Sequence, residues 1–157
     1  MKLFLLMTLS LVFGRGGSNR ISEQAREMVC RVNLYRRRSG MPPVYLDRRL
    51  MESARQHSQD QASHRRLSHR GSRGTNFEMR SRRAGYRFTT GGENVAQGQR
   101  GVRDVMATWI RSPGHRANIV SRNKCFGFGE VNGYWTQVFG SGDHCTERQL
   151  PSCRGFF

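Results

Sequence analysis

The sequence predicts an α+β fold in which helices come first and an antiparallel hairpin packs on them. Apolar residues recur at helical spacing in three stretches between residues 21 and 109. Further along, aromatic and β-branched runs flank Asn132-Gly133. Asn-Gly is the strongest short signal for a hairpin, because both turn residues must accept a positive φ. Helices followed by a hairpin are typical of the α+β class.

The first helix is expected over Ile21–Arg38. Ser22 is a good N-cap, and Glu23 lies in the first turn, where a negative charge suits the helix dipole. Gly40 and the following prolines end the helix. One face carries an apolar stripe at helical spacing, made of Ala25, Met28, Val29, Val32 and Tyr35.

The second helix is expected to begin after Asp47, which is a good N-cap. Its inner face includes Leu50, Ala54 and His57. We expect His57 to be a core histidine satisfied by a hydrogen bond rather than a catalytic group.

Two shorter helices and a turn are expected further along. Residues 76–84 form a short helix ended by Gly85. Gly91-Gly92 is expected to be a flexible turn before Glu93. A last helical stripe ends before Pro113 and consists of Val102, Val105, Met106 and Trp109.

The charge of the chain is strongly positive. Lys plus Arg number 27 and Asp plus Glu number 11, so the formal charge is 27 − 11 = +16 in a chain of 157 residues. Such a chain is attracted to anionic membranes, acidic glycans or nucleic acid. The arginines are spread along the whole sequence and no nucleic-acid-binding motif is visible, so a specific nucleic-acid partner is not expected.

The N-terminus has the layout of a secretory signal peptide. One lysine precedes an apolar stretch that ends at Phe13, and small residues follow. We expect residues 1–17 to be the signal peptide and residues 22–142 to form one domain. Residues 143–157 would be a tail pinned by disulfides. The expected product is a secreted monomer.

Four cysteines agree with export, since an even number in a small secreted domain suggests two disulfides. Four cysteines allow three connectivities. We favour Cys145–Cys153, close across the tail, together with Cys30–Cys125, and the other pairings remain open.

Three polar residues lie next to Gly or Pro turns, so we expect them to extend from loops into a shared cleft: His69, Glu93 and His115. Two imidazoles and a carboxylate form a minimal set for a divalent metal such as zinc or magnesium, with water in the open position. Their spacing is not itself a metal-binding motif.

An ordered set of motifs resembles the CAP superfamily, or SCP domain, which groups cysteine-rich secretory, antigen 5 and pathogenesis-related 1 proteins. The likeness covers roughly residues 26 to 140, and its central block is closest to the bacterial, fungal and oomycete branch. The motifs, in family order, are Leu67-Ser68-His69, Gly92-Glu93-Asn94-Val95-Ala96, Trp109-Ile110-Arg111-Ser112-Pro113-Gly114-His115-Arg116, Phe126-Gly127-Phe128-Gly129 and Tyr134-Trp135-Thr136-Gln137.

The resemblance implies an α-β-α sandwich with a small antiparallel sheet between helix layers. Many members carry two His and two Glu in a cavity that holds a divalent metal. His69 matches the first of these two histidines, and Glu93 matches the first of the two glutamates. Ser112 stands where the second glutamate is expected and Tyr134 where the second histidine is expected, so half of the set is replaced. His115 is a candidate stand-in for the lost histidine.

The resemblance and the charge favour a secreted, non-enzymatic binding module, and the resemblance implies a role related to pathogenesis or defence. Its partners would be a small apolar ligand, such as a sterol or fatty acid, or an anionic membrane or glycan surface. One alternative is a hydrolase, either metal-dependent or using Ser112 as nucleophile with His69 and Glu93. Another is a cationic protein that disrupts membranes.

Overall fold

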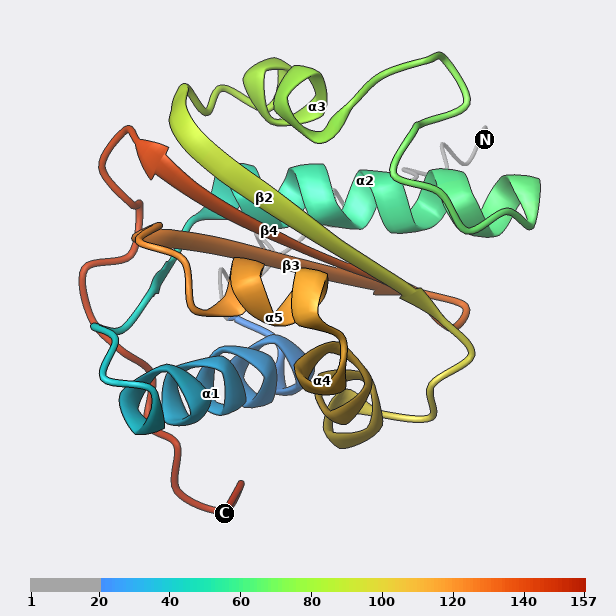
Figure 1. Ribbon diagram of the computed structural model, residues 1–157. Coiled ribbons are helices and arrows are strands. Elements are labelled where there is room, and N and C mark those ends of the chain that lie inside the picture. Colours follow the sequence, from blue (N-terminus) through green and yellow to red (C-terminus); the bar gives the residue numbers. More distant parts are fainter. Residues whose placement is uncertain (1–20) are drawn as a thin grey trace, which may run out of the picture.

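The computed structural model describes residues 21–157, and the signal peptide expected over residues 1–17 lies outside them. The described part contains five helices and four strands (Figure 1). In chain order these are α1 (Glu23–Arg38), β1 (Tyr45–Leu46), α2 (Arg48–His64), α3 (Phe77–Arg83), β2 (Phe88–Gln97), α4 (Val102–Arg111), α5 (Pro113–Ile119), β3 (Cys125–Val131) and β4 (Tyr134–Gly142). No helix within this range is long and apolar enough to cross a membrane.

The predicted helix starts are confirmed by their caps. The Ser22 side chain accepts from the Ala25 backbone N–H, and Asp47 accepts from the N–H groups of Arg49 and Leu50. The Asn76 side chain begins α3 in the same way. These caps satisfy backbone donors that have no partner inside the first helical turn.

The sheet has the strand order β1-β3-β4-β2. Strands β3 and β4 form the predicted hairpin around Asn132-Gly133, and β2 pairs antiparallel with β4. The two-residue strand β1 pairs parallel with β3, so the sheet is mixed rather than wholly antiparallel. Because β2 is the last strand in this order, one of its edges is left for side chains and loops to cover.

Helices cover both faces of the sheet, as the α-β-α sandwich requires. Figure 1 shows α2 and α3 on one side and α1, α4 and α5 on the other. The larger core lies on the α1 side and includes Met28, Trp109, Phe126 and Phe139. The smaller core lies under α2 and includes Leu50, Tyr86 and Val138.

Helix α2 packs unusually close to β3 because the strand presents glycines to it. A Cβ built on Gly127 would collide with the backbone of Leu50 and Met51. A Cβ on Gly129 would collide with the backbone of Ala54 and Arg55. The alternating partners Phe126 and Phe128 point to the opposite face, where they join the larger core.

A buried arginine ties α1 to the segment that follows α5. Arg36 is fully buried and donates to the carbonyl oxygens of Pro42, Ile119, Ser121 and Asn123 at 2.7 to 3.2 Å. Burial lowers the pKa of this guanidinium. The carbonyl groups compensate for the loss of water around the charge.

Two expectations about local structure are wrong. Gly91-Gly92 is not a turn but lies inside β2, paired with Gly140 and Phe139. The segment around His115 is not a loop but helix α5, which begins at Pro113. Proline suits the first helical position because its φ is already helical and its missing N–H would be unpaired there.

The favoured disulfide pairing is also wrong. The bonds join Cys30 to Cys153 and Cys125 to Cys145. Cys125 pairs with Gly140 across the hairpin, so the chain leaving β4 brings Cys145 back beside the start of β3. The tail then continues to α1, where Cys153 meets Cys30 (Figure 1). All four cysteines are bonded, as expected.

The close approach of α2 and β3 gives a direct test of the packing. Gly127→Ala would force a methyl group into the α2 backbone, and we expect it to lower the free energy of unfolding by about 1–3 kcal/mol. Gly114→Ala is the matched control, because Gly114 lies in a helix with open space around it. Urea unfolding of both variants measures the difference, and equal effects would contradict the packing described.

Candidate functional site

The site is built around Glu93, in the middle of the edge strand β2. Glu93 is opposite Val138 of β4, and its side chain is 2% exposed. Residues alternate along a strand, so Glu93 points to the α2 side while Asn94 points to the α5 side. A buried carboxylate needs partners of opposite charge or hydrogen-bond donors.

Arg80 of α3 supplies the main counter-charge. Its Nη2 donates to Glu93 Oε2, and its side chain is only 8% exposed. Its Nη1 donates to the carbonyl oxygens of Thr75 and His69, at 2.8 and 3.2 Å. One guanidinium therefore holds α3, the preceding loop and β2 together.

Two histidines from different environments face the other carboxylate oxygen. His69 Nδ1 lies 3.0 Å from Glu93 Oε1, while the rest of its side chain is 61% exposed. His57 Nε2 lies 3.9 Å from the same oxygen and donates to the Ser68 carbonyl at 2.8 Å. The hydrogen bond to Glu93 raises the pKa of His69, whereas burial lowers the pKa of His57. His57 is thus a core histidine with a hydrogen bond, as predicted.

An amide network on the other face of β2 brings in α5. Asn94 Nδ2 donates to the His115 carbonyl at 3.1 Å, and Asn94 Oδ1 accepts from Asn118 Nδ2 at 2.8 Å. Asn118 Nδ2 also donates to the Glu93 carbonyl at 3.0 Å. The amide of Asn118 occupies the space that a Cβ on Gly92 would need, which explains the glycine in this strand.

His115 of α5 lies within electrostatic range of His69. Burial lowers the pKa of His115, and the charge of His69 lowers it further. Its Nδ1 is buried and has no hydrogen-bond partner among residues 21–157. His69 thus contacts Glu93, and His115 lies close enough to His69 for the charge of His69 to affect its pKa; the cleft expected to be shared by the three residues stays a prediction.

Within residues 21–157, Ser112 and Tyr134 make no hydrogen bond to Glu93, His69 or His115. Ser112 precedes α5, where its carbonyl accepts from the Arg116 N–H and its side chain makes no capping bond. Tyr134 lies opposite Gln97, four residues along β2 from Glu93, which is about 13 Å at strand spacing. The Tyr134 hydroxyl accepts from Gln97 Nε2 at 2.9 Å.

The residues present do not fit a zinc or magnesium ion. Both oxygens of Glu93 already face cationic partners, Arg80 and His69. Within the described part of the chain, no group of three or more His, Cys, Asp or Glu is placed to hold a metal. Hard cations such as magnesium bind through oxygen ligands, chiefly free carboxylates, and zinc needs three or four converging ligands.

The arrangement can hold a proton and present a cation, but it has no activated nucleophile. Among residues 21–157, the Ser112 side chain makes no hydrogen bond to a histidine of the kind that activates a serine. The exposed part of His69 is the group that can contact a ligand, and Glu93 fixes its ring and its charge.

Arg80 and Asn118 are the site residues that the sequence analysis missed. Helical spacing over 76–84 places Arg80 on the same face as Phe77 and the buried Ser81. An arginine on the inner face of a short helix calls for a buried acid, so this pattern is a signal that points to Arg80. No comparable sequence pattern identifies Asn118, which lies close to Glu93 only because α5 packs against β2.

Breaking the buried pair tests its structural role. Glu93→Gln would leave Arg80 buried without its counter-charge, and we expect the free energy of unfolding to fall by about 3 kcal/mol or more. The control is Glu52→Gln, which breaks an ion pair with Arg55 whose side chains are 44% and 56% exposed. Exposed pairs contribute at most about 1 kcal/mol. Similar losses in both variants, measured by chemical unfolding, would contradict the assignment.

The raised pKa of His69 predicts a pH-dependent stability. Protonated His69 stabilises the fold, fully so below its ordinary pKa of about 6.5, and this contribution is lost as pH rises through the folded-state value. His69→Gln should therefore be less stable than the unaltered protein below about pH 6.5, with the gap closing as the pH rises through the raised folded-state pKa of His69. Unfolding curves across this range measure the gap. A gap independent of pH would contradict the His69–Glu93 pair.

Comparison with known proteins supports the motif assignment. The family model described as "Cysteine-rich secretory protein family" matches residues 29–139. The chain is 33% identical over 123 residues to the uncharacterized protein YkwD of Bacillus subtilis (strain 168). That alignment covers 76% of this chain and 48% of YkwD, so the chain spans about half the length of this relative.

Solved structures show the same fold. An extracellular protein of Bacillus anthracis that contains an SCP domain superposes with a TM-score of 0.72 at 22% identity, over 80% of this chain and 45% of the other. An outer surface protein of Borrelia burgdorferi gives 0.69 at 18% identity, over 77% and 94%. A cysteine-rich secretory protein of Staphylococcus aureus gives 0.65 at 14% identity, over 78% and 40%.

The matched residues include every element that builds the cluster around Glu93, from α2 to β4. The expected α-β-α sandwich is confirmed by the bacterial SCP-domain structures. On the family match and the identity to YkwD, this chain belongs to the CAP family of cysteine-rich secretory proteins, in its bacterial branch.

Proposed function

We propose that this protein is a secreted, non-enzymatic binding module whose ligand is a small aliphatic carboxylate. The observation that carries the proposal is an apolar pocket between α1 and the C-terminal tail, with one arginine in its lining. Export is supported by the two disulfides, which persist in oxidising compartments. The similar proteins described as extracellular and outer-surface also support it.

The pocket has a volume of about 290 Å³. This is near the lower end of the roughly 300–1,000 Å³ typical of small-molecule sites, and it suits a fatty acyl chain better than a sterol. Its walls are mainly Val29, Leu34, Met41, Pro43, Leu150, Pro151 and Phe157, together with Cys30, Asn33, Arg37 and Cys153.

The tail forms one wall and is held firmly against α1. Cys153 is bonded to Cys30, and Arg31 Nη2 donates to the Phe156 carbonyl at 2.9 Å. Arg26 stacks over the ring of Phe156 at 5.3 Å. A wall fixed in this way does not have to be ordered when a ligand binds, which favours affinity.

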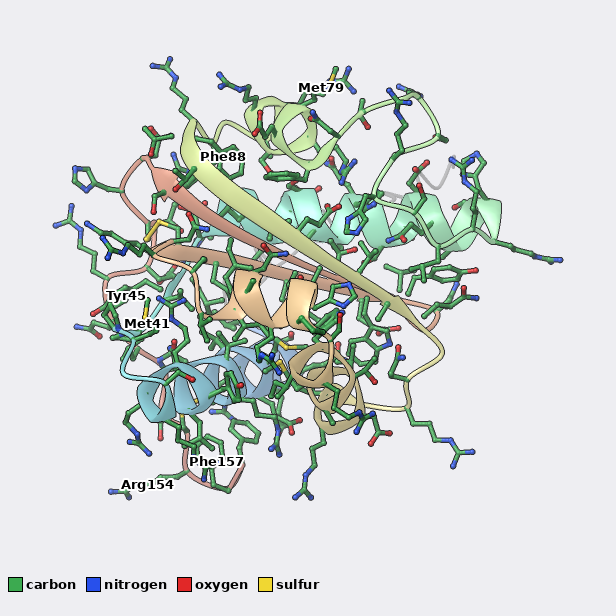
Figure 2. The ribbon with its side chains drawn as sticks, in the orientation of Figure 1. Met41, Tyr45, Met79, Phe88, Arg154 and Phe157 are labelled. Carbon is green, nitrogen blue, oxygen red and sulfur yellow. A yellow bond between two sulfur atoms is a disulfide. The ribbon has the colours of Figure 1, made fainter. Side chains whose placement is uncertain are left out.

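Two large apolar side chains of this pocket remain open to solvent. Leu150 is 45% exposed and Phe157 is 67% exposed. Figure 2 shows Phe157 beside α1 at the end of the tail, and Met41 just beyond the C-terminal end of the same helix. Exposed apolar side chains that line a hollow mark a binding surface.

Arg37 selects the head group of the ligand. It lies in the last part of α1, is exposed, and has no carboxylate within ion-pair distance among residues 21–157. An arginine fork binds a carboxylate through two parallel hydrogen bonds. An aliphatic chain against the apolar wall with its carboxylate on Arg37 satisfies both parts of the pocket.

Titration calorimetry with dodecanoate and dodecanol tests the proposal. Leu150→Gln should weaken dodecanoate binding about tenfold, since the lost apolar contact is about 1.5 kcal/mol. Arg37→Gln should weaken dodecanoate but leave dodecanol unchanged. Met79→Gln is the matched control, because Met79 is equally exposed, at 45%, on α3. Absence of dodecanoate binding, or equal losses in the Met79 control, would overturn the proposal.

A second proposal concerns the anionic surfaces to which the protein would adhere. The chain has 27 basic and 11 acidic residues, and most of its arginines have no acidic partner to neutralise them. Within the described residues, the arginines in ion pairs are Arg31, Arg48, Arg49, Arg55 and Arg80. The remaining cationic surface attracts acidic glycans or anionic lipid head groups.

A further inference from the structure

A second hollow lies on the opposite side of the molecule from the tail, between α2, α3 and the loop that joins them. Its volume is about 510 Å³. Helix α2 contributes residues four positions apart, which form one stripe along its surface. The hollow is lined by Gln56, Asp60, His64, Ser72, Arg73, Thr75, Arg80 and Arg83.

The loop wall of this groove is fastened at several points. Asp60 accepts from both the backbone N–H and the hydroxyl of Ser72. Arg80 donates to the Thr75 carbonyl, and Ser68 is held by Gln61 through its backbone N–H at 3.1 Å. The groove is therefore preformed, and a ligand would bind without ordering the loop.

The groove carries unsatisfied positive charge. Arg73 and Arg83 are both exposed, and neither has a carboxylate within 4 Å in the described chain. Arg80 is 7% exposed, and its Nε has no hydrogen-bond partner among residues 21–157. The one acid in the lining, Asp60, is already engaged by Ser72 and lies 3.4 Å from His64. Figure 2 shows nitrogen-tipped side chains projecting outward around α3 and the loop before it.

The lining favours a carbohydrate among anionic ligands. Gln56, Ser72 and Thr75 carry the neutral polar groups that hydrogen-bond to hydroxyls. Arginine forks match sulfate and carboxylate groups. No Phe, Tyr or Trp lines the groove, so bases of a nucleic acid would find no ring on which to stack.

We propose that the groove between α2 and α3 binds an acidic sugar unit of a sulfated or carboxylated glycan, with Arg73 and Arg83 holding its anionic groups. This inference rests on the second proposal above, that the cationic surface meets anionic ligands, and names the site and the ligand class. It does not depend on the apolar pocket beside α1.

Titration with a heparin-derived hexasaccharide tests the groove. The double variant Arg73→Gln/Arg83→Gln should weaken binding at least about tenfold, since two charge-assisted contacts are lost. The matched control is Arg103→Gln/Arg111→Gln, which removes the same charge from exposed positions of α4. The control should change the affinity less than about twofold, because distant exposed charges are screened. Circular dichroism and melting curves check that both variants remain folded.

Three results would overturn the proposal that the groove binds an acidic glycan. The first is an equal loss of hexasaccharide affinity in the two double variants. This would indicate binding through general surface charge and contradict a specific site in the groove. The second is no measurable binding of the hexasaccharide, which would contradict both the specific site and the binding of glycans through general surface charge. The third is a single-stranded oligothymidylate of equal charge that binds as tightly and depends on the same two arginines. Dodecanoate binding should be the same in both double variants, so the apolar pocket is judged separately.

Discussion

The buried carboxylate of Glu93 is the constraint on which this side of the molecule depends. An ionised carboxylate inside a sheet edge is stable only if cations and donors surround it. Arg80 and His69 meet this need from two segments. Because Arg80 also holds the carbonyl groups of His69 and Thr75, satisfying one acid fixes the loop before α3. The groove between α2 and α3 owes its shape to the same arginine.

The other side of the molecule, around α1, is stabilised by a different interaction. Arg36 is buried without an acid and is satisfied by carbonyl oxygens from the chain after α1 and after α5. Nearby, the Cys30–Cys153 bond closes the tail on α1. Together they position the surface that carries the apolar pocket. The apolar pocket beside α1 and the groove between α2 and α3 are therefore held by different interactions, so a ligand in one need not disturb the other.

The replacement of half of the family's acidic and imidazole set has a physical consequence. Where a second glutamate and a second histidine are expected, this chain has Ser112 and Tyr134, and among residues 21–157 neither is hydrogen-bonded to Glu93. The remaining carboxylate is neutralised by an arginine instead of a metal. The cluster that remains holds the largely exposed side chain of His69 against Glu93.

Local signals in the sequence determined most of the secondary structure and the family, and they indicated His69 and Glu93 as candidate site residues. Caps such as Ser22 and Asp47, and the Asn132-Gly133 turn, act over a few residues and can be seen in the chain itself. The turn predicted at Gly91-Gly92 was wrong because these glycines allow close packing inside a strand, Gly92 against Asn118 and Gly91 against the rings of Phe77 and Phe88. Only the tertiary structure decided the disulfide partners, the Arg80–Glu93 pair and both hollows. Each of these joins segments whose proximity is set by strand order and helix packing, and no local pattern encodes such distances.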